Sequence, residues 1–167
     1  DPKQTISNIL NGLLALKNYN FIFTLPNIDS GNLVIRNEII SFVKKYKNIS
    51  RFYESLGSLK YLSLIRDAVI IAGNSSSAII ESPIVKTISL DIGVRQKGRE
   101  RSKSTVSCSS GISEIKHGLN RAIKLSKSKS DKIFYSPYYK KNTSNVIRDK
   151  IIKFGFQSLG EKKFYDR

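Results

Sequence analysis

Apolar residues follow two alternating spacings along this chain. Ile6, Ile9, Leu10 and Leu13 recur three or four positions apart, as on one face of a helix, whereas residues 21–25 form the short apolar run of a buried strand. Applied to the whole chain, these patterns predict helices near 6–14, 34–43, 58–66, 76–81, 113–125 and 143–154, and strands at 21–25, 50–53, 68–72, 87–90 and 105–108.

Helix and strand therefore alternate, which implies a parallel sheet covered by helices on both faces. We expect an α/β fold built on a doubly wound parallel sheet of the Rossmann-like kind. In such sheets ligands bind beyond the carboxyl ends of the strands. Two polar loops occupy that place, at 73–77 after the strand 68–72 and at 91–99 after the strand 87–90.

The first of these loops reads Gly-Asn-Ser-Ser-Ser from residue 73. A glycine permits a sharp turn, serines can cap the helix that follows, and the free amides of a helix start suit a phosphate. Glu81 falls roughly one and a half turns into that helix, where it could accept a sugar hydroxyl. Taken alone, this segment is explained more simply as an ordinary capped junction between strand and helix.

Composition sets the class of protein. The chain has 167 residues, of which 40% are hydrophobic and 25% charged, as in a soluble globular domain. No apolar run reaches the roughly 18 residues of a membrane span, so no membrane partner is expected. Cys108 is the single cysteine, which suits a reducing cytoplasm, and we interpret it as a buried strand residue. One cysteine and one histidine, His117, cannot assemble a zinc site, so no metal is expected.

The formal net charge of +16 would attract nucleic acid, anionic membranes or phosphorylated metabolites alike. The lysines and arginines are scattered along the chain, and we interpret them as solvated surface. No zinc-ligand pattern, glycine–aromatic strand signature or basic helix leading into heptads accompanies them. A nucleic-acid-binding domain is kept as the alternative from a different class, although we do not expect a nucleic-acid partner.

Four motifs occur in one order along the chain. They are Pro-Asn-x-Asp-x-Gly at 26–31, Leu-Gly-x-Leu-x-Tyr-Leu at 56–62, Gly-Asn-Ser-Ser-Ser at 73–77 and Ile-Gly-x-Arg-Gln-x-Gly-Arg at 92–99. Together they resemble the hydrolysing UDP-N-acetylglucosamine 2-epimerases of sialic and related nonulosonic acid pathways. The resemblance covers most of this chain but corresponds only to the C-terminal lobe of a two-lobed, glycosyltransferase-B-like enzyme.

The resemblance implies a set of UDP-binding residues. They are Asn27, Leu56, Tyr61, Ser75, Ser76, Glu81 and Arg95. Ser75 and Ser76 would hold the diphosphate, and Glu81 would accept the ribose hydroxyls. Leu56 would meet uracil through its backbone, with Tyr61 lining or covering the base.

The remaining residues of that set would act from neighbouring loops. Arg95 would reach the phosphates or the sugar, because a guanidinium engages two oxygens at once. Asn27 would approach the sugar-phosphate side. Arg99 is a weaker candidate that is equally well explained as the partner in an ion pair anchoring its loop.

The resemblance implies elimination of UDP from UDP-N-acetylglucosamine, followed by addition of water to give N-acetylmannosamine. In that family the carboxylates that move the proton at carbon 2 belong to the N-terminal lobe, so no catalytic residue is expected in this chain. We interpret Asp29 and Asp91 as turn residues. No cofactor is expected, and the chain alone should bind nucleotide weakly and turn nothing over.

We expect a UDP-binding Rossmann-like lobe at 1–130, with its first strand missing upstream, and a linker with a C-terminal helix that packs back on the lobe at 131–167. Expected partners are a UDP-sugar substrate and the missing N-terminal lobe, and a homo-oligomer is left open. Asp1-Pro2 stands where the family has His-Pro. A relative acting on a UDP-diacetamido-trideoxyhexose is an alternative, and a lobe of another UDP-sugar glycosyltransferase would not explain the motif at 92–99.

Overall fold

The computed structural model describes residues 1–26, 32–127 and 130–154. The chain divides into two compact units, Asp1–Pro137 and Tyr138–Arg167. Each unit is described by itself. The functional boundary predicted near residue 130, and the packing of the last helix onto the first unit, stay predictions.

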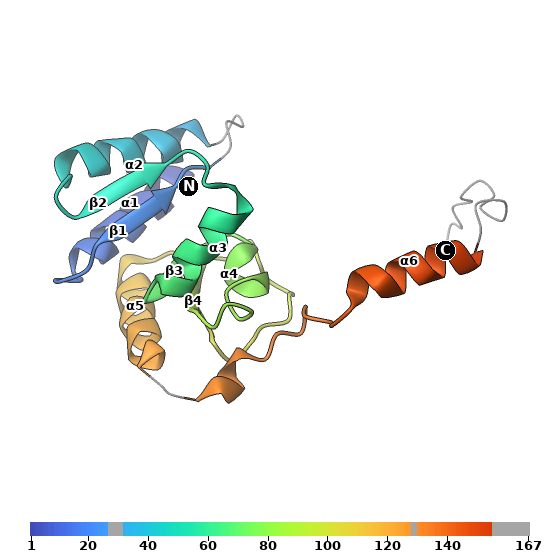
Figure 1. The fold of residues 1–167 in the computed structure, drawn as a ribbon. Helices are drawn as coiled ribbons and strands as arrows, with labels where there is room; N and C mark the ends of the chain where they lie inside the picture. The colour runs from blue at the N-terminus through green and yellow to red at the C-terminus, as the bar shows by residue number, and fades with distance from the viewer. Residues whose placement is uncertain (27–31, 128–129, 155–167) are drawn as a thin grey trace, which may run out of the picture. The chain divides into compact units, whose positions relative to one another are not determined.

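The helices and strands expected from the sequence are present, with small shifts at their ends (Figure 1). The helices are α1 (Pro2–Leu14), α2 (Leu33–Lys45), α3 (Gly57–Asp67), α4 (Ser77–Ile80), α5 (Ile112–Ser126) and α6 (Thr143–Phe154). The strands are β1 (Phe21–Thr24), β2 (Ser50–Tyr53), β3 (Ile70–Gly73), β4 (Ile88–Ile92) and β5 (Thr105–Cys108). A short 3-10 helix, η1 (Asp131–Phe134), lies where the sequence predicted only a linker.

The strands form two parallel sheets among the described residues. β1 pairs with β2, and β4 lies between β3 and β5. The Rossmann-like α/β fold predicted from the sequence is confirmed, but the single expected sheet is interrupted between β1 and β3. These two strands are not hydrogen-bonded to each other.

The second sheet is built around β4, in which all five residues are buried. Its apolar side chains pack against α5, where Ile115, Leu119 and Ala122 are at most 1% exposed. α5 can approach this closely because residue 118 is glycine. A Cβ there would lie 2.8 Å from Leu90 Cδ1.

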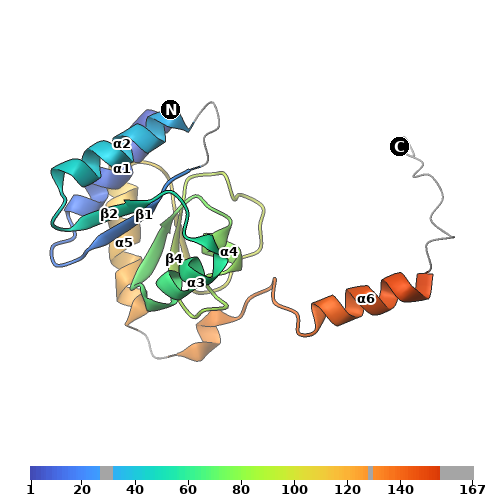
Figure 2. The same cartoon turned by 45° about the horizontal axis from the view of Figure 1, so that its top comes forward.

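Helix α1 joins the two sheets. Asp1 caps it by accepting a hydrogen bond from the Lys3 amide at 2.9 Å, and Pro2 stands in its first turn. Ile6 and Leu10 belong to the hydrophobic cluster beneath α2, whereas Leu13 belongs to the cluster around β4. α1 accordingly packs against both α2 and α5 (Figure 2).

The second unit contains α6, whose bounds match the sequence prediction. Its apolar residues are exposed, with Ile152 at 71% and Phe154 at 68%. In the first unit Phe134 packs against the core, whereas Tyr135 is 77% exposed. None of the described helices is both long and apolar enough to cross a membrane.

Candidate functional site

A polar hollow of about 410 Å³ opens at the carboxyl ends of β1 and β3. Its lining residues are Thr24, Tyr61, Ser75, Ser76, Ser77, Ile80 and Glu81. Thr24 is the last residue of β1, and the three serines follow β3 after one intervening residue, Asn74. This is the edge at which open α/β sheets bind ligands, and the volume is in the range of small-molecule sites.

A second hollow, of about 250 Å³, lies at the opposite edge of the sheet. It is lined near the starts of β3 and β4 by residues that include Val69, Thr87 and Ile88. No motif of the sequence falls there, and ligands of such sheets bind at the carboxyl edge. The candidate site is therefore the hollow at Ser75.

The loop after β3 carries the hydroxyls of this site. Gly73 ends the strand with φ +153, and the Ser75 Oγ accepts a hydrogen bond from the Ser77 amide at 3.3 Å. Ser75 is exposed and Ser76 half-buried, so their hydroxyls are accessible to a ligand. The helix that follows has only four residues. The expected support from a helix dipole is therefore weak, and a phosphate would depend on the hydroxyls and amides of the loop itself.

A chain of hydrogen bonds fixes the carboxylate at the side of the hollow. The Tyr61 hydroxyl donates to Ser77 Oγ at 2.8 Å, and Ser77 Oγ donates in turn to the Glu81 carboxylate. Burial raises the pKa of Tyr61. The hydrogen bond to Ser77 lowers this pKa, and the nearby charge of Glu81 raises it further. Tyr61 therefore lines the hollow as a neutral hydroxyl whose proton is engaged by Ser77.

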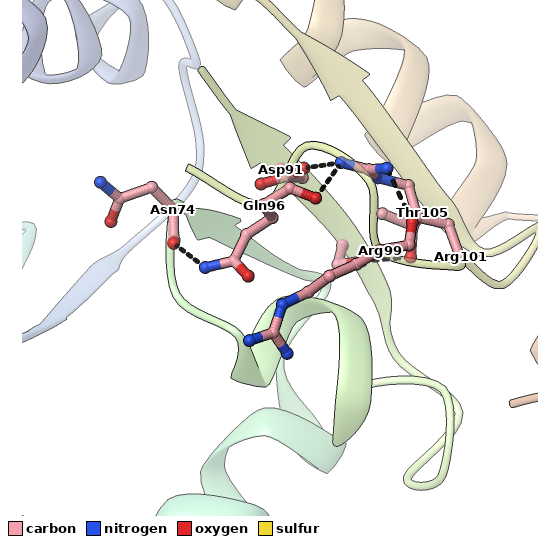
Figure 3. A network of polar contacts seen from close by, with 7 residues as sticks. Asn74, Asp91, Gln96, Arg99, Arg101 and Thr105 are labelled. Atoms are coloured by element: carbon pink, nitrogen blue, oxygen red, sulfur yellow. Dashed lines mark hydrogen bonds and ion pairs between the residues drawn. The ribbon is translucent and has the colours of Figure 1, made fainter. Parts of the chain in front are cut away.

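A polar network ties the loop after β4 to the loop after β3 (Figure 3). Gln96 is 4% exposed, and its Nε2 donates to the Asn74 carbonyl oxygen at 2.9 Å. Arg101 donates from Nη2 to the Gln96 carbonyl at 3.0 Å and to Asp91 at 2.8 Å. The two motifs that the sequence placed after neighbouring strands are thus joined by direct contacts.

This network corrects two expectations. Asp91 is not a turn residue: it lies within β4, is fully buried, and forms an ion pair with Arg101. The ion pair that anchors the loop is made by Arg101 and not by Arg99, which is exposed and contributes its carbonyl to Arg101. An acid directly after an apolar run resembles a turn residue, and only the fold reveals its counter-ion ten residues later.

Four of the seven sequence-predicted site residues meet at one place. Tyr61, Ser75, Ser76 and Glu81 line the hollow. Leu56 is half-buried at the start of α3, and Arg95 is exposed beside Gln96; neither is among the residues lining the hollow. Asn27 lies outside the described residues.

Sequence reasoning missed three residues that line the hollow, namely Thr24, Ser77 and Ile80. Ser77 stands four positions before Glu81, a helical spacing at which side chains meet, so its contact with the carboxylate could have been foreseen. Thr24 lies within the strand predicted at 21–25, but no sequence pattern indicates that it lies beside Ser75.

The single cysteine and histidine play no part in this site. Cys108 lies in strand β5 as expected but is half-buried instead of buried, and His117 is exposed on α5. Within the described ranges, His, Cys, Asp and Glu form no group of three that could hold a metal ion.

The fold and the hollow define a Rossmann-like α/β protein with a polar site at the carboxyl ends of parallel strands. Residues 1–152 match the family described as UDP-N-acetylglucosamine 2-epimerase, and the chain belongs to this family.

Curated relatives carry related names. A Campylobacter jejuni protein named GDP/UDP-N,N'-diacetylbacillosamine 2-epimerase (hydrolyzing) is 40% identical over 64% of this chain and 28% of its own length. The Escherichia coli polysialic acid biosynthesis protein P7 is 35% identical over 96% of this chain and 41% of its own length. A UDP-N-acetylglucosamine 2-epimerase of Neisseria meningitidis is 31% identical over 72% of this chain and 31% of its own length. The chain thus spans less than half the length of each of these relatives.

Proposed function

We propose that the hollow at Ser75 binds the UDP portion of a UDP-sugar, in an enzyme that eliminates UDP from UDP-N-acetylglucosamine and adds water to release the 2-epimer. One observation carries the proposal. Four residues assigned to UDP from the sequence, Tyr61, Ser75, Ser76 and Glu81, line the same hollow. Family membership supports the class of substrate.

Glu81 is the residue suited to the ribose. Among the described residues its carboxylate has one hydrogen-bond partner, the Ser77 hydroxyl on Oε2. A carboxylate accepts several hydrogen bonds, so it retains capacity for the two vicinal hydroxyls of a ribose. Hydrogen bonds to a charged acceptor are stronger than neutral ones, which makes Glu81 the expected main determinant of affinity.

The diphosphate would lie against the serine loop. Ser75 and Ser76 offer hydroxyl donors there, and the Gln96 bond to the Asn74 carbonyl holds the loop after β4 beside them. Arg95 directly precedes Gln96 and is exposed outside the hollow, and we assign its guanidinium to a phosphate contact made from that loop. Fixed donors of this kind stabilise the negative charge that develops on a departing UDP.

Chemistry at carbon 2 of the sugar requires an acid and a base, which we assign to the rest of the full-length enzyme. Asp91 is sequestered by Arg101, and Glu81 is engaged by Ser77. We therefore expect this chain to bind UDP without turning over the sugar nucleotide. The relatives' names also leave a UDP-diacetamido-trideoxyhexose as the alternative substrate.

The test is a calorimetric titration of the chain with UDP. We expect saturable one-to-one binding that Glu81→Gln weakens about tenfold to hundredfold, since a hydrogen bond to a charged group contributes about 1.5–3 kcal/mol. Glu114→Gln is the matched control, because Glu114 is exposed in the first turn of α5 and does not line the hollow.

Two outcomes would contradict the proposal. Equal UDP affinity in the wild type and Glu81→Gln would show that UDP does not bind in the hollow. A chain that fails to bind UDP but binds a DNA duplex, with affinity falling steeply as salt rises, would instead favour the nucleic-acid alternative.

A further inference from the structure

Ser77 lies between the two sides of the hollow, and its hydrogen bonds reach both. Its amide donates to Ser75 Oγ at 3.3 Å, on the side assigned to the diphosphate. Its hydroxyl donates to the Glu81 carboxylate, on the side assigned to the ribose. Ser77 itself is only 8% exposed, so both bonds are largely shielded from water.

The direction of each hydrogen bond between Tyr61 and Glu81 follows from the chemistry of the groups. An ionised carboxylate only accepts hydrogen bonds, so the proton between Ser77 and Glu81 comes from the serine. A hydroxyl has a single proton, so Ser77 Oγ accepts from the Tyr61 hydroxyl, at 2.8 Å. Burial raises the pKa of Tyr61, which keeps its phenol proton available for this bond. The Ser77 hydroxyl therefore has no proton left for a phosphate.

The backbone of Ser77 orients Ser75 in the opposite sense. Because Ser75 Oγ accepts the Ser77 amide proton, the Ser75 hydroxyl proton stays available, and in the described part of the chain it is donated to no other group. Ser75 is exposed and lines the hollow, so this proton can reach a ligand. Ser77 thus leaves a hydroxyl donor on one side of the hollow and a charged acceptor on the other.

This arrangement suits a molecule with an anionic group at one end and neighbouring hydroxyls at the other, as in a ribonucleoside diphosphate. A 2′-deoxyribose lacks one of the two vicinal hydroxyls, so one hydrogen bond to Glu81 would be lost. A free carboxylate could turn toward water and recover that bond, whereas a carboxylate held by Ser77 stays in place and is left with an unsatisfied acceptor. A site built to bind a hydroxyl rejects the analogue that lacks it for this reason.

We propose that Ser77, held in turn by Tyr61, is the positioning residue that makes the hollow select a ribose over a 2′-deoxyribose. The inference rests on the proposed binding of UDP and deepens it, because it names the residues through which Glu81 discriminates between the two sugars. It also changes the role of Tyr61 from the one that the resemblance implies. The Tyr61 hydroxyl acts on the ribose side of the site through Ser77, not on uracil.

The test measures the dissociation constants of UDP and 2′-deoxy-UDP by calorimetry and compares their ratio between variants. In the wild-type chain 2′-deoxy-UDP should bind about tenfold or more weakly than UDP, because a hydrogen bond to a charged acceptor is lost. Ser77→Ala should reduce this ratio to about threefold or less, because the carboxylate is then free to turn toward water. Tyr61→Phe should reduce the ratio by a smaller factor, because it removes a bond one step further from Glu81.

Ser82→Ala is the matched control. Ser82 is fully buried and donates to the Ala78 carbonyl at 2.8 Å, so its variant also loses a buried hydrogen bond, but Ser82 does not line the hollow. A variant that is merely less stable weakens the binding of both nucleotides alike, so the ratio separates positioning from damage to the fold, which urea unfolding measures. The double variant of Ser77→Ala with Tyr61→Phe should match Ser77→Ala alone, because Tyr61 acts through Ser77.

Two results would overturn the inference and leave the proposed function standing. One is an unchanged ratio in Ser77→Ala while UDP binding still depends on Glu81. The other is additive effects of Ser77→Ala and Tyr61→Phe, which would show that the two residues act on the sugar independently. A wild-type chain that binds no UDP would overturn the inference together with the proposed function. A ratio that falls in Ser77→Ala and stays unchanged in Ser82→Ala supports it.

Discussion

The bond from Gln96 to the Asn74 carbonyl is the sharpest point at which to perturb the site. Gln96 is 4% exposed and donates at 2.9 Å across 22 positions of sequence, so it connects the two loops directly. Gln96→Leu removes this donor while keeping a similar volume. Asn74 itself is exposed, so water can satisfy its carbonyl after the change.

The size of the effect follows from the bond that is lost. A neutral intramolecular hydrogen bond contributes about 0.5–1.5 kcal/mol, so Gln96→Leu should lower the free energy of unfolding by about 1 kcal/mol. If the bond also holds Ser75 and Ser76 in their binding geometry, UDP affinity should fall by about twofold to tenfold. This range corresponds to the free energy of the lost hydrogen bond, which limits the loss of binding free energy.

Urea unfolding and UDP titration would measure the two effects separately. Gln4→Leu is the matched control, because Gln4 is an exposed glutamine that donates to Asn8 at 2.9 Å on α1, away from the hollow. A double-mutant cycle with Ser75→Ala would show whether the two residues act on the same loop. The reasoning is refuted if Gln96→Leu loses stability while UDP affinity is unchanged, or if the cycle is additive.

Two further predictions concern the ion pair of Arg101 with Asp91 and the thiol of Cys108. Arg101→Met should lower the free energy of unfolding more than Asp91→Asn does, because the Asp91 side chain is 1% exposed and would remain as an unpaired buried charge, whereas the Arg101 side chain is 28% exposed. Breaking a buried ion pair costs about 3–5 kcal/mol. Urea unfolding that shows the reverse order of the two variants would contradict this account. Burial raises the pKa of the Cys108 thiol, and the charges of Asp91 and Glu114 raise it further against the opposing effect of Arg121. The folded state therefore holds this proton more tightly than the unfolded state, so the stabilisation is complete below the ordinary thiol pKa and is lost as pH rises above it. Urea midpoints across alkaline pH should fall more steeply for the wild type than for Cys108→Ala, and parallel curves would rule the effect out.

Local patterns predicted the elements well because helices and strands here have regular apolar spacing. The range of α6 matched, and β2 and β5 were placed without error. What the patterns could not supply was the pairing between strands, because backbone hydrogen bonds between strands leave no trace in the spacing of side chains. Which strands pair with which therefore appeared only in the structure.

In the candidate site, too, local sequence patterns identified some residues, whereas contacts between distant segments appeared only in the structure. Ser75, Ser76 and Glu81 lie close in sequence, so a motif could identify them together. Thr24 and Asn74 contribute through contacts made by the fold, one by ending β1 beside the hollow and the other by offering its carbonyl to Gln96. Neither contact has a local sequence signal.

The hydrogen bonds from Tyr61 through Ser77 to Glu81 have a consequence for binding. A free glutamate side chain loses rotational freedom when a ligand captures it, which costs about 1 kcal/mol per immobilised side chain. Here that ordering is accomplished during folding, because Ser77 already holds the carboxylate. A hydroxyl that enters the hollow meets a preorganised acceptor, and binding adds no entropic cost for ordering the Glu81 side chain.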